Sequence, residues 1–495
     1  MPCEIAPSPD MSGVLELPWI IQGGMGIGVS NWRLARAVSL RGQLGVVSGT
    51  VLDAVLARRL QDGDEGGHMR RALDHFPLRH VAADVLRRYF RPDGRPAGTP
   101  YKPIPMYRQV VSRARQQLTI LASFAEVWLA KEGHAGPVGI NLLAKVQLPN
   151  LATLYGAMLA QVDYVLMGAG IPREIPGVLD AFSEGRAASI RLEVEGLQAG
   201  ESERLAFDPS AYLEGTAPAL ARPRFLPIVA SNSLATMLAR KANGRVDGFV
   251  VEGPTAGGHN APPRGEPRLN ERGEPLYGER DVVDLEQLGA LGLPFWVAGG
   301  AGAPERLRDA RRAGAAGIQV GTLFAYCDES GLAEAYKRSV LAHAARGEVD
   351  VVTDGRASPT GYPFKVVRWP GDPGTAGRER ICDLGYLRVP YRTPEGRVGY
   401  RCAAEPVEDY VRKGGRPEDA EGRQCLCNAL LANIGLAQVR PGGRIEPPLL
   451  TSGDDLRSIA RFLAGRTRYT AAEVIDYLLS AEPGRGAVSS TAPLR

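Results

Sequence analysis

Eight short apolar runs, most of them ending in Gly or Ser, constrain the fold of this chain more than any other feature. They occupy residues 19–23, 44–49, 138–143, 163–168, 226–231, 248–252, 295–299 and 317–321. Amphipathic stretches that predict helices lie at residues 31–40, 234–242, 304–313 and 332–346. Strands that alternate with helices are typical of a parallel sheet. Eight such units favour an α/β fold of the (β/α)8 TIM barrel type over a doubly wound open sheet.

Three segments fall outside this alternation. Residues 61–107, rich in His, Arg and Pro, form an insertion after the second strand, where we expect a loop that shapes the substrate mouth. Residues 181–224 contain an alternating stretch, which predicts a small β excursion after the fourth strand. The sequence thus predicts a barrel domain over residues 1–350 and a long C-terminal extension over residues 351–495.

Composition excludes several classes of protein. Hydrophobic residues make up 44% and charged residues 23% of the chain, as in ordinary globular proteins. The net charge of +4 is small and diffuse, which argues against nucleic acid or a membrane surface as the partner. The first residues lack a secretory signal, no run is long enough to span a membrane, and six Cys do not indicate a disulfide framework. We therefore expect a cytoplasmic protein with reduced thiols.

The stretch VDGFVVEGPTAGGHN, residues 246–260, contains one histidine just after a predicted buried strand. Gly257 and Gly258 precede His259, and a backbone without side chains can approach a flat ligand closely. Catalytic groups usually lie at the carboxyl ends of barrel strands. His259 is therefore the candidate catalytic residue, with a purely structural histidine as the alternative.

Two glycine-rich turns predict a phosphate site. The sequence AGGAG at residues 298–302 follows the seventh strand, and QVGT at residues 319–322 ends the eighth. In TIM barrels the loops after these two strands commonly bind phosphate through backbone N–H groups and a helix N-terminus. The Thr322 hydroxyl would add a further donor.

The first and third strands add two more ligand-facing features. The sequence QGGMG at residues 22–26 offers bare backbone to a planar ring, but Val29 breaks the G-x-G-x-x-G pattern and argues against a Rossmann dinucleotide site. Asn141 is a polar residue within an apolar strand. Its side chain either bonds a ligand ring or satisfies a neighbouring backbone group.

Taken in order, QGGMG, GIN, VASN, VEGPTAGGH, AGGAG and GIQVGT resemble the motifs of the nitronate monooxygenase family, formerly called 2-nitropropane dioxygenases. Bacterial flavin-dependent enoyl reductases share that fold. The resemblance covers about residues 17–323 and implies a TIM-barrel flavoprotein that holds FMN non-covalently, with His259 as its catalytic histidine. The cofactor-binding residues implied by position are Gly23, Gly24, Met25, Asn141, Ser231, Glu252, Gly257, Gly258, Gly299, Gly300, Gln319, Val320, Gly321 and Thr322.

This chain departs from the family pattern beside the histidine. The family usually has Gln in place of Glu252 and an acidic residue in place of Thr255. A carboxylate would disfavour a reduced, anionic flavin, so Glu252 is expected to be protonated, turned away or bonded elsewhere. These departures put the substrate in doubt more than the cofactor.

The extension carries two further candidate features and ends in a helix. Its four cysteines, which could bind zinc or an iron–sulfur cluster or be merely buried and unreactive, are Cys382, Cys402, Cys425 and Cys427. Residues 354–365 suggest a lid in which Tyr362 or Lys365 touches substrate, or else a plain surface turn. A helix is expected at Ala471–Leu479, with Thr470 as its N-cap.

Three functions follow from these features. The first is an FMN-dependent nitronate monooxygenase in which His259 takes the α-proton of a nitroalkane and O2 completes the oxygenation. The second is an NAD(P)H-dependent reductase of enoyl thioesters or quinones. In it, a phosphorylated carrier or nucleotide would bind Arg70, Arg71, Arg79 and Lys102, whose charges could equally form a solvated face. The third is a non-catalytic flavin-binding subunit. A small-molecule substrate is expected in the first two, with a homodimer or a carrier-protein or subunit partner as further expectations.

Overall fold

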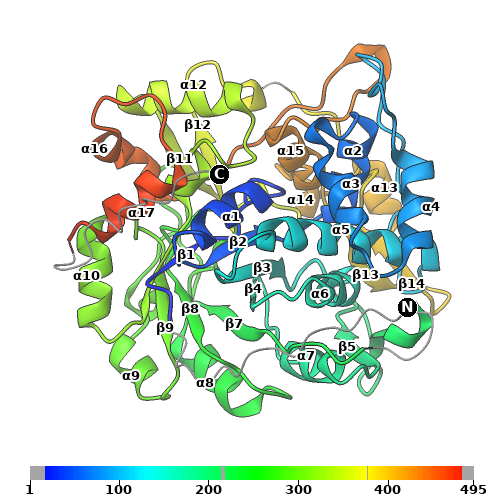
Figure 1. The fold of residues 1–495 in the computed structure, drawn as a ribbon, viewed down its shortest axis with the longest axis horizontal. Helices are drawn as coiled ribbons and strands as arrows, with labels where there is room; N and C mark the ends of the chain where they lie inside the picture. Colours follow the sequence, from blue (N-terminus) through cyan, green and yellow to red (C-terminus); the bar gives the residue numbers. More distant parts are fainter. Residues whose placement is uncertain (1–16, 213–217, 376, 482–495) are drawn as a thin grey trace.

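Eight parallel strands form the centre of the molecule (Figure 1), and the computed structural model describes residues 17–212, 218–375 and 377–481. Their order is β1-β10-β9-β8-β7-β4-β3-β2. The bounds are β1 Ile20–Gln22, β2 Gly45–Ser48, β3 Val138–Leu143, β4 Tyr164–Gly168, β7 Arg224–Val229, β8 Phe249–Glu252, β9 Phe295–Ala298 and β10 Gly317–Val320. Backbone bonds join the outer strands, since Gln22 N donates to Leu44 O at 2.9 Å and Leu44 N to Ile20 O at 3.1 Å. The sheet closes into a TIM barrel, and all eight predicted strands are confirmed.

Alternate residues of the same strands divide between two apolar clusters. Ile21 and Val250 belong to a small cluster, whereas their neighbours Ile20 and Val251 belong to the large one. Because successive strand side chains point to opposite faces, the small cluster fills the barrel interior and the large one lies under the helices. Trp296 is fully buried in the interior cluster, and its indole N–H donates to Pro18 O at 2.7 Å. Because side chains fill the barrel interior, a ligand site is expected at an end of the barrel.

Helices surround the barrel. Their bounds are α1 Trp32–Ser39, α2 Leu52–Gln61, α5 Arg113–Lys131, α6 Asn150–Leu159, α7 Ile175–Ser183, α8 Asn232–Lys241, α9 Leu285–Gly289, α10 Pro304–Arg312, α11 Thr322–Ala325 and α12 Glu334–Ala345. The four helices predicted from amphipathic stretches correspond to α1, α8, α10 and α12. The Asn31 side chain caps α1 by accepting from Leu34 N at 3.0 Å, and α10 begins at a proline, which suits the first position of a helix.

The two insertions differ in structure. The first is helical, with α3 His68–Leu73 and α4 Arg79–Tyr89 packed against α2 and α5. The second contains an antiparallel hairpin, β5 Ala188–Leu192 and β6 Glu203–Phe207, as the alternating sequence predicts.

The extension folds as two hairpins followed by helices that cover the barrel (Figure 1). The strands are β11 Asp350–Asp354, β12 Phe364–Arg368, β13 Val389–Arg392 and β14 Val398–Arg401, and the helices are α13 Val407–Arg412, α14 Pro417–Ala420, α15 Leu426–Asn433, α16 Ile459–Leu463 and α17 Ala471–Leu479. Thr470 caps α17 in a capping box with Glu473, as predicted. Helix α17 packs against α1 and α10, and α16 packs against α12. Within the described residues, no helix is long and apolar enough to cross a membrane.

Candidate functional site

A cavity of about 400 Å³ opens at the carboxyl ends of the barrel strands. Its walls come from the turns after β1, β8, β9 and β10, from the end of β3, and from the extension. This volume lies within the range of small-molecule and cofactor sites. His259 and most of the predicted cofactor-binding residues line it, namely Gly23, Gly24, Met25, Asn141, Glu252, Gly257, Gly258, Gly299, Gly300, Gln319, Gly321 and Thr322.

Two predicted cofactor-binding residues, Ser231 and Val320, do not line the cavity. The Ser231 hydroxyl caps α8 by accepting from Leu234 N at 3.1 Å, so its oxygen is used within the helix. Val320 is 1% exposed, and its carbonyl accepts from Gly23 N at 2.9 Å. Because strand side chains alternate, the side chain between Gln319 and Gly321 points away from the cavity. The structure therefore places neither Ser231 nor Val320 in the cavity wall.

The wall formed by β1 and β3 suits a planar ring. A Cβ at Gly24 would lie 2.2 Å from the Asn141 Cβ, so only glycine fits beside that side chain. Asn141 Nδ2 donates to Gly24 O at 3.2 Å, whereas Asn141 Oδ1 and Gln319 Oε1 are buried without a partner in the described chain. Buried polar atoms are as a rule satisfied, so these two oxygens indicate a ligand with N–H donors.

The turn after β9 suits an anion. Gly299 and Gly300 have φ of 89° and 62°, in the left-handed region that favours glycine. Among the described residues, no acceptor receives the N–H groups of Gly300 and Ala301. These free donors lie just before α10, whose N-terminus carries the positive end of the helix dipole.

The extension forms the wall of the cavity beside the turns after β9 and β10. The sequence did not predict these contacts. Gly453 N donates to the Thr322 hydroxyl at 3.1 Å, and Gly302 N donates to Asp455 Oδ2 at 3.0 Å. Burial raises the pKa of Asp455. Residues 451–455, TSGDD, therefore belong to the site, and only the small and acidic character of this stretch could have indicated it.

Strand β12 of the extension holds the histidine turn in place. Lys365 N donates to Gly258 O at 2.9 Å, and Gly258 N donates to the Thr451 hydroxyl at 2.8 Å. The imidazole of His259 packs edge-to-face on Phe364, with 4.8 Å between ring centroids. The turn is thereby held on both sides by residues that follow it by about a hundred positions or more.

A short hydroxyl chain orients the imidazole. His259 Nε2 lies 2.7 Å from Ser358 Oγ, which lies 2.8 Å from Thr360 Oγ1. No group in the described chain bonds Nδ1. Burial lowers the pKa of His259 to about 4, so the ring is neutral at neutral pH. The tautomer with Nε2–H donating to Ser358 leaves the Nδ1 lone pair free to accept a proton.

Glu252, at the end of β8, is the second titratable group of the cavity. Burial raises its pKa to about 8, so the carboxyl is protonated at neutral pH. A protonated carboxyl is one of the three arrangements that the sequence predicts for Glu252 beside a reduced flavin.

The predicted lid is only partly correct. Tyr362 lines the cavity, but Lys365 does not. Its ammonium forms an ion pair with Asp454 Oδ1 at 2.8 Å, and its side chain is 5% exposed. Of the two residues predicted as alternatives for a substrate contact, Tyr362 thus borders the cavity and Lys365 does not.

The first insertion does not shape the mouth, contrary to expectation. None of residues 61–107 lines the cavity. Arg70 pairs with Asp64 at 3.1 Å and Arg71 with Glu132 at 2.8 Å, while Arg79 and Lys102 are likewise absent from the cavity wall. Arg70 thus pairs within the insertion, and Arg71 pairs with the residue that follows α5.

The predicted metal site is not supported. Over the described ranges, no group of three or more His, Cys, Asp or Glu side chains could hold a metal ion. Cys382, Cys402, Cys425 and Cys427 are free thiols. One of them, Cys427, does line the cavity.

The fold and cavity define a TIM barrel with its ligand site at the carboxyl ends of the strands. Residues 219–358, which include β7 to β10 and His259, match the family model for nitronate monooxygenase. A nitronate monooxygenase from Pseudomonas aeruginosa is 37% identical over 124 residues, which are 24% of this chain and 32% of that relative. The chain thus matches about a third of the relative's length. The resemblance to the nitronate monooxygenase family predicted from the motifs is confirmed over this part of the chain.

Solved structures show weaker likeness over longer stretches. FabK from Thermotoga maritima gives a TM-score of 0.46 at 18% identity, covering 94% of this chain and 92% of that one. Nitroalkane oxidase from Streptomyces ansochromogenes gives 0.43 at 15% identity, covering 94% of this chain and 96% of that one.

Proposed function

We propose that this protein is an FMN-dependent oxidoreductase of the nitronate monooxygenase type. One observation carries the proposal: a neutral histidine, unpartnered amide oxygens and free backbone donors converge on a single cavity. The oxygens of Asn141 and Gln319 suit the polar edge of a flavin ring, and the turn after β9 suits its phosphate. When bound, FMN would supply the redox chemistry.

The protein's own part in the reaction is proton transfer. His259 Nδ1 accepts the α-proton of a nitroalkane, and Nε2–H donates to Ser358 while Ser358 O–H donates to Thr360. The imidazolium forms next to the negative charge that the substrate acquires, which offsets the cost of charging a buried ring.

An absorbance spectrum followed by anaerobic additions tests the proposal. We expect flavin peaks that bleach with propionate 3-nitronate and not with NADH or NADPH. A protein without flavin peaks, even after reconstitution with FMN, contradicts cofactor binding at the cavity.

A reductase of enoyl thioesters or quinones is the second candidate, and protonated Glu252 favours it. That carboxyl places a proton donor in the same cavity as His259, as reduction of a C=C bond requires. Bleaching by a nicotinamide, with no response to the nitronate, would select this function.

A further inference from the structure

One side of the cavity takes no part in the proton transfer or in the predicted cofactor contacts. Six apolar side chains line it, and we call them the apolar wall: Ile27, Val29, Val51, Leu387, Leu426 and Leu430. Three of them follow β1 and β2 of the barrel, and three belong to the extension. A wall of this composition binds an apolar group, because contact removes the apolar surfaces of both partners from water.

The barrel part and the extension part of the apolar wall are joined by direct contacts. Helix α15 of the extension ends against the turn after β1, since a Cβ at Gly28 would lie only 2.9 Å from Ile434 Cδ1. The Tyr386 hydroxyl donates to Asp53 in the first turn of α2, which follows β2. These contacts bring the extension's part of the wall to the side of the cavity formed by the turns after β1 and β2.

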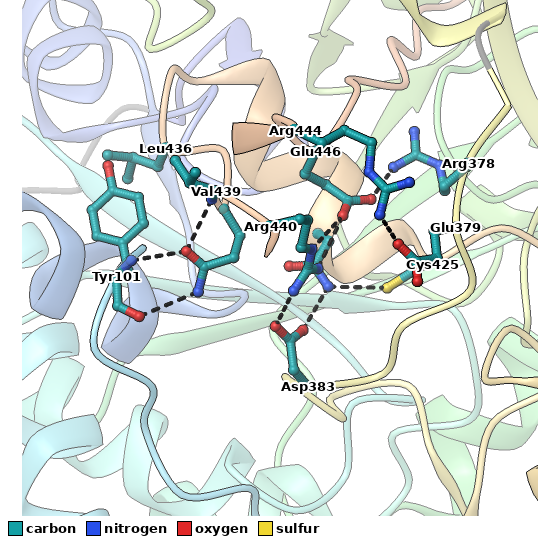
Figure 2. Close-up of polar contacts among 12 residues, drawn as sticks. Tyr101, Arg378, Glu379, Asp383, Cys425, Leu436, Val439, Arg440, Arg444 and Glu446 are labelled. Atoms are coloured by element: carbon teal, nitrogen blue, oxygen red, sulfur yellow. Dashed lines mark hydrogen bonds and ion pairs between the residues drawn. The ribbon is translucent and has the colours of Figure 1, made fainter. Parts of the chain in front are cut away.

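A polar network outside the cavity fixes the position of α15 (Figure 2). Asn428 Nδ2 donates to Asp383 Oδ1 at 2.7 Å, and Asp383 pairs with Arg440 at 2.6 Å. Leu426 and Leu430 each lie two positions from Asn428, and residues two positions apart do not share a face of a helix. The network therefore holds α15 on the face that is turned away from the cavity, while both leucines line the cavity.

Asn433 and Tyr386, two polar residues that also line the cavity here, use their hydrogen-bonding groups within the protein. Asn433 Nδ2 donates to Leu449 O at 2.8 Å, and Leu449 N donates to Asn433 Oδ1 at 3.0 Å. The Tyr386 hydroxyl bonds Asp53. In contrast, Asn260 Oδ1, in the histidine turn, is buried without a partner in the described chain. Polar recognition is thus concentrated on the opposite walls, and the apolar wall provides dispersion and hydrophobic contact.

Val51 gives independent support because its backbone is strained. Its φ of 62° lies in the left-handed region, where a β-branched residue is a genuine outlier. Glycine would adopt this conformation without strain, yet the chain places an isopropyl group there, and that group lines the cavity. Strain that persists at a ligand site indicates a function for the residue, which here is an apolar surface after β2.

We propose that the apolar wall binds an unbranched alkyl chain, so that the substrates of this site are aliphatic compounds of medium chain length. Leu426 and Asn433, the two ends of α15, both line the cavity, and the helix rises about 10 Å between them. An extended chain of medium length covers that distance, with its reactive end at His259. The inference rests on the proposed function, because the chain belongs to the substrate of that site.

Isothermal titration calorimetry of the full-length protein with straight-chain carboxylates tests the proposal. A carboxylate resembles a nitronate in carrying two oxygens on a planar anion, and it does not reduce a flavin. From butyrate to octanoate, we expect binding to tighten about 4-fold for each added methylene, as burial of a methylene in an apolar site predicts. Because the titration involves no turnover, its result is independent of whether a nitroalkane is oxidised.

Two matched leucine substitutions show where the chain lies. Leu430→Asn replaces an apolar side chain of the wall by an amide of similar size, so octanoate should bind about 10-fold more weakly, with a smaller change for butyrate. Leu479→Asn is the control, because Leu479 is also a half-buried leucine on a helix of the extension but does not line the cavity. Octanoate should bind this control as it binds the wild type.

Two results would overturn the proposal. The first is a folded wild-type protein whose affinity is the same for butyrate and octanoate, as expected if the flavin ring covers the wall. The second is equal weakening of octanoate binding in Leu430→Asn and Leu479→Asn, which would place the chain elsewhere. Turnover of nitroethane and 1-nitrooctane is measured separately. A rising carboxylate series without any turnover would contradict the proposed function and support the alkyl site, whereas turnover with a flat series would do the reverse.

Discussion

The barrel and the extension build the same cavity by different means. The barrel supplies glycine turns, backbone N–H groups and amide oxygens at the ends of its strands. The extension supplies side chains that hold those turns and orient His259, through Ser358, Phe364 and Thr451. Under the proposed function, the barrel provides the reacting groups while the extension determines their geometry. Substitutions in the barrel should therefore act on chemistry, and substitutions in the extension on alignment.

The largest effect should come from His259→Asn in the barrel. Removing a general base commonly costs 10²–10⁴-fold, so we expect turnover of a neutral nitroalkane to fall about 1,000-fold while FMN stays bound. Turnover of the preformed nitronate, which needs no proton abstraction, should change little. Steady-state kinetics with both substrates and a flavin spectrum check this, and full activity on the nitroalkane would falsify the base assignment.

Next in size is the pH dependence of stability caused by Glu252 in the barrel. Its pKa is about 8 in the folded protein against 4.5 for a solvent-exposed glutamate, so the folded state binds the extra proton between these pH values. Stability should therefore fall as pH rises through this window, by at most about 1.4 kcal/mol per pH unit.

Urea unfolding of the wild type and of Glu252→Gln at several pH values measures this contribution. The amide cannot titrate, so the variant's advantage in the free energy of unfolding should grow from about pH 5 to pH 8. A difference that does not vary with pH would show that Glu252 is ionised in the folded protein.

A smaller effect is expected for Ser358→Ala in the extension. Without the hydroxyl, the imidazole is no longer fixed in the tautomer that frees Nδ1, and kcat should fall about 10-fold with KM little changed. Ser358→Thr should restore most of the activity. Ser480→Ala, at an exposed position after α17, is the matched control. A rise in KM alone would indicate substrate binding instead of alignment.

The smallest effect should come from Thr451→Val, which removes the acceptor for Gly258 N. One neutral hydrogen bond contributes about 1 kcal/mol, so we expect FMN to bind about 5-fold more weakly with kcat of the loaded protein nearly unchanged. Fluorescence titration of the apoprotein with FMN measures this. A large loss of kcat at full FMN occupancy would contradict the division of labour between barrel and extension.

The barrel could be predicted from sequence because its signals are local and periodic. Eight apolar runs, glycine turns at their ends and the capping box at Thr470 each lie within a few residues. Ser231 and Val320 lie outside the cavity wall because the motif was extended to neighbouring residues, whose side chains serve a helix cap and the sheet. Matching residues to a family motif by position does not show which side chains of a strand face the cavity and which face away from it.

The contacts of the extension could not be predicted in the same way. The bond from His259 to Ser358 joins residues 99 positions apart, and the bond from Gly258 to Thr451 joins residues 193 positions apart. Hydrophobic periodicity carries no information about pairs at such separations. The ion pair of Lys365 could not be predicted for the same reason, because its partner Asp454 lies 89 positions further along the chain.

The bond between Gly258 and Thr451 also bears on the order in which the protein is made. A ribosome adds about 5–20 residues per second, so the 193 residues between these partners take roughly 10–40 s to appear. Once Thr322 has been added, the nascent chain carries the histidine and both glycine turns, while Ser358, Phe364 and Thr451, which contact the histidine turn, are still to be made. The site therefore matures late in translation, and a chain released early would hold every recognisable motif without the segments that align them.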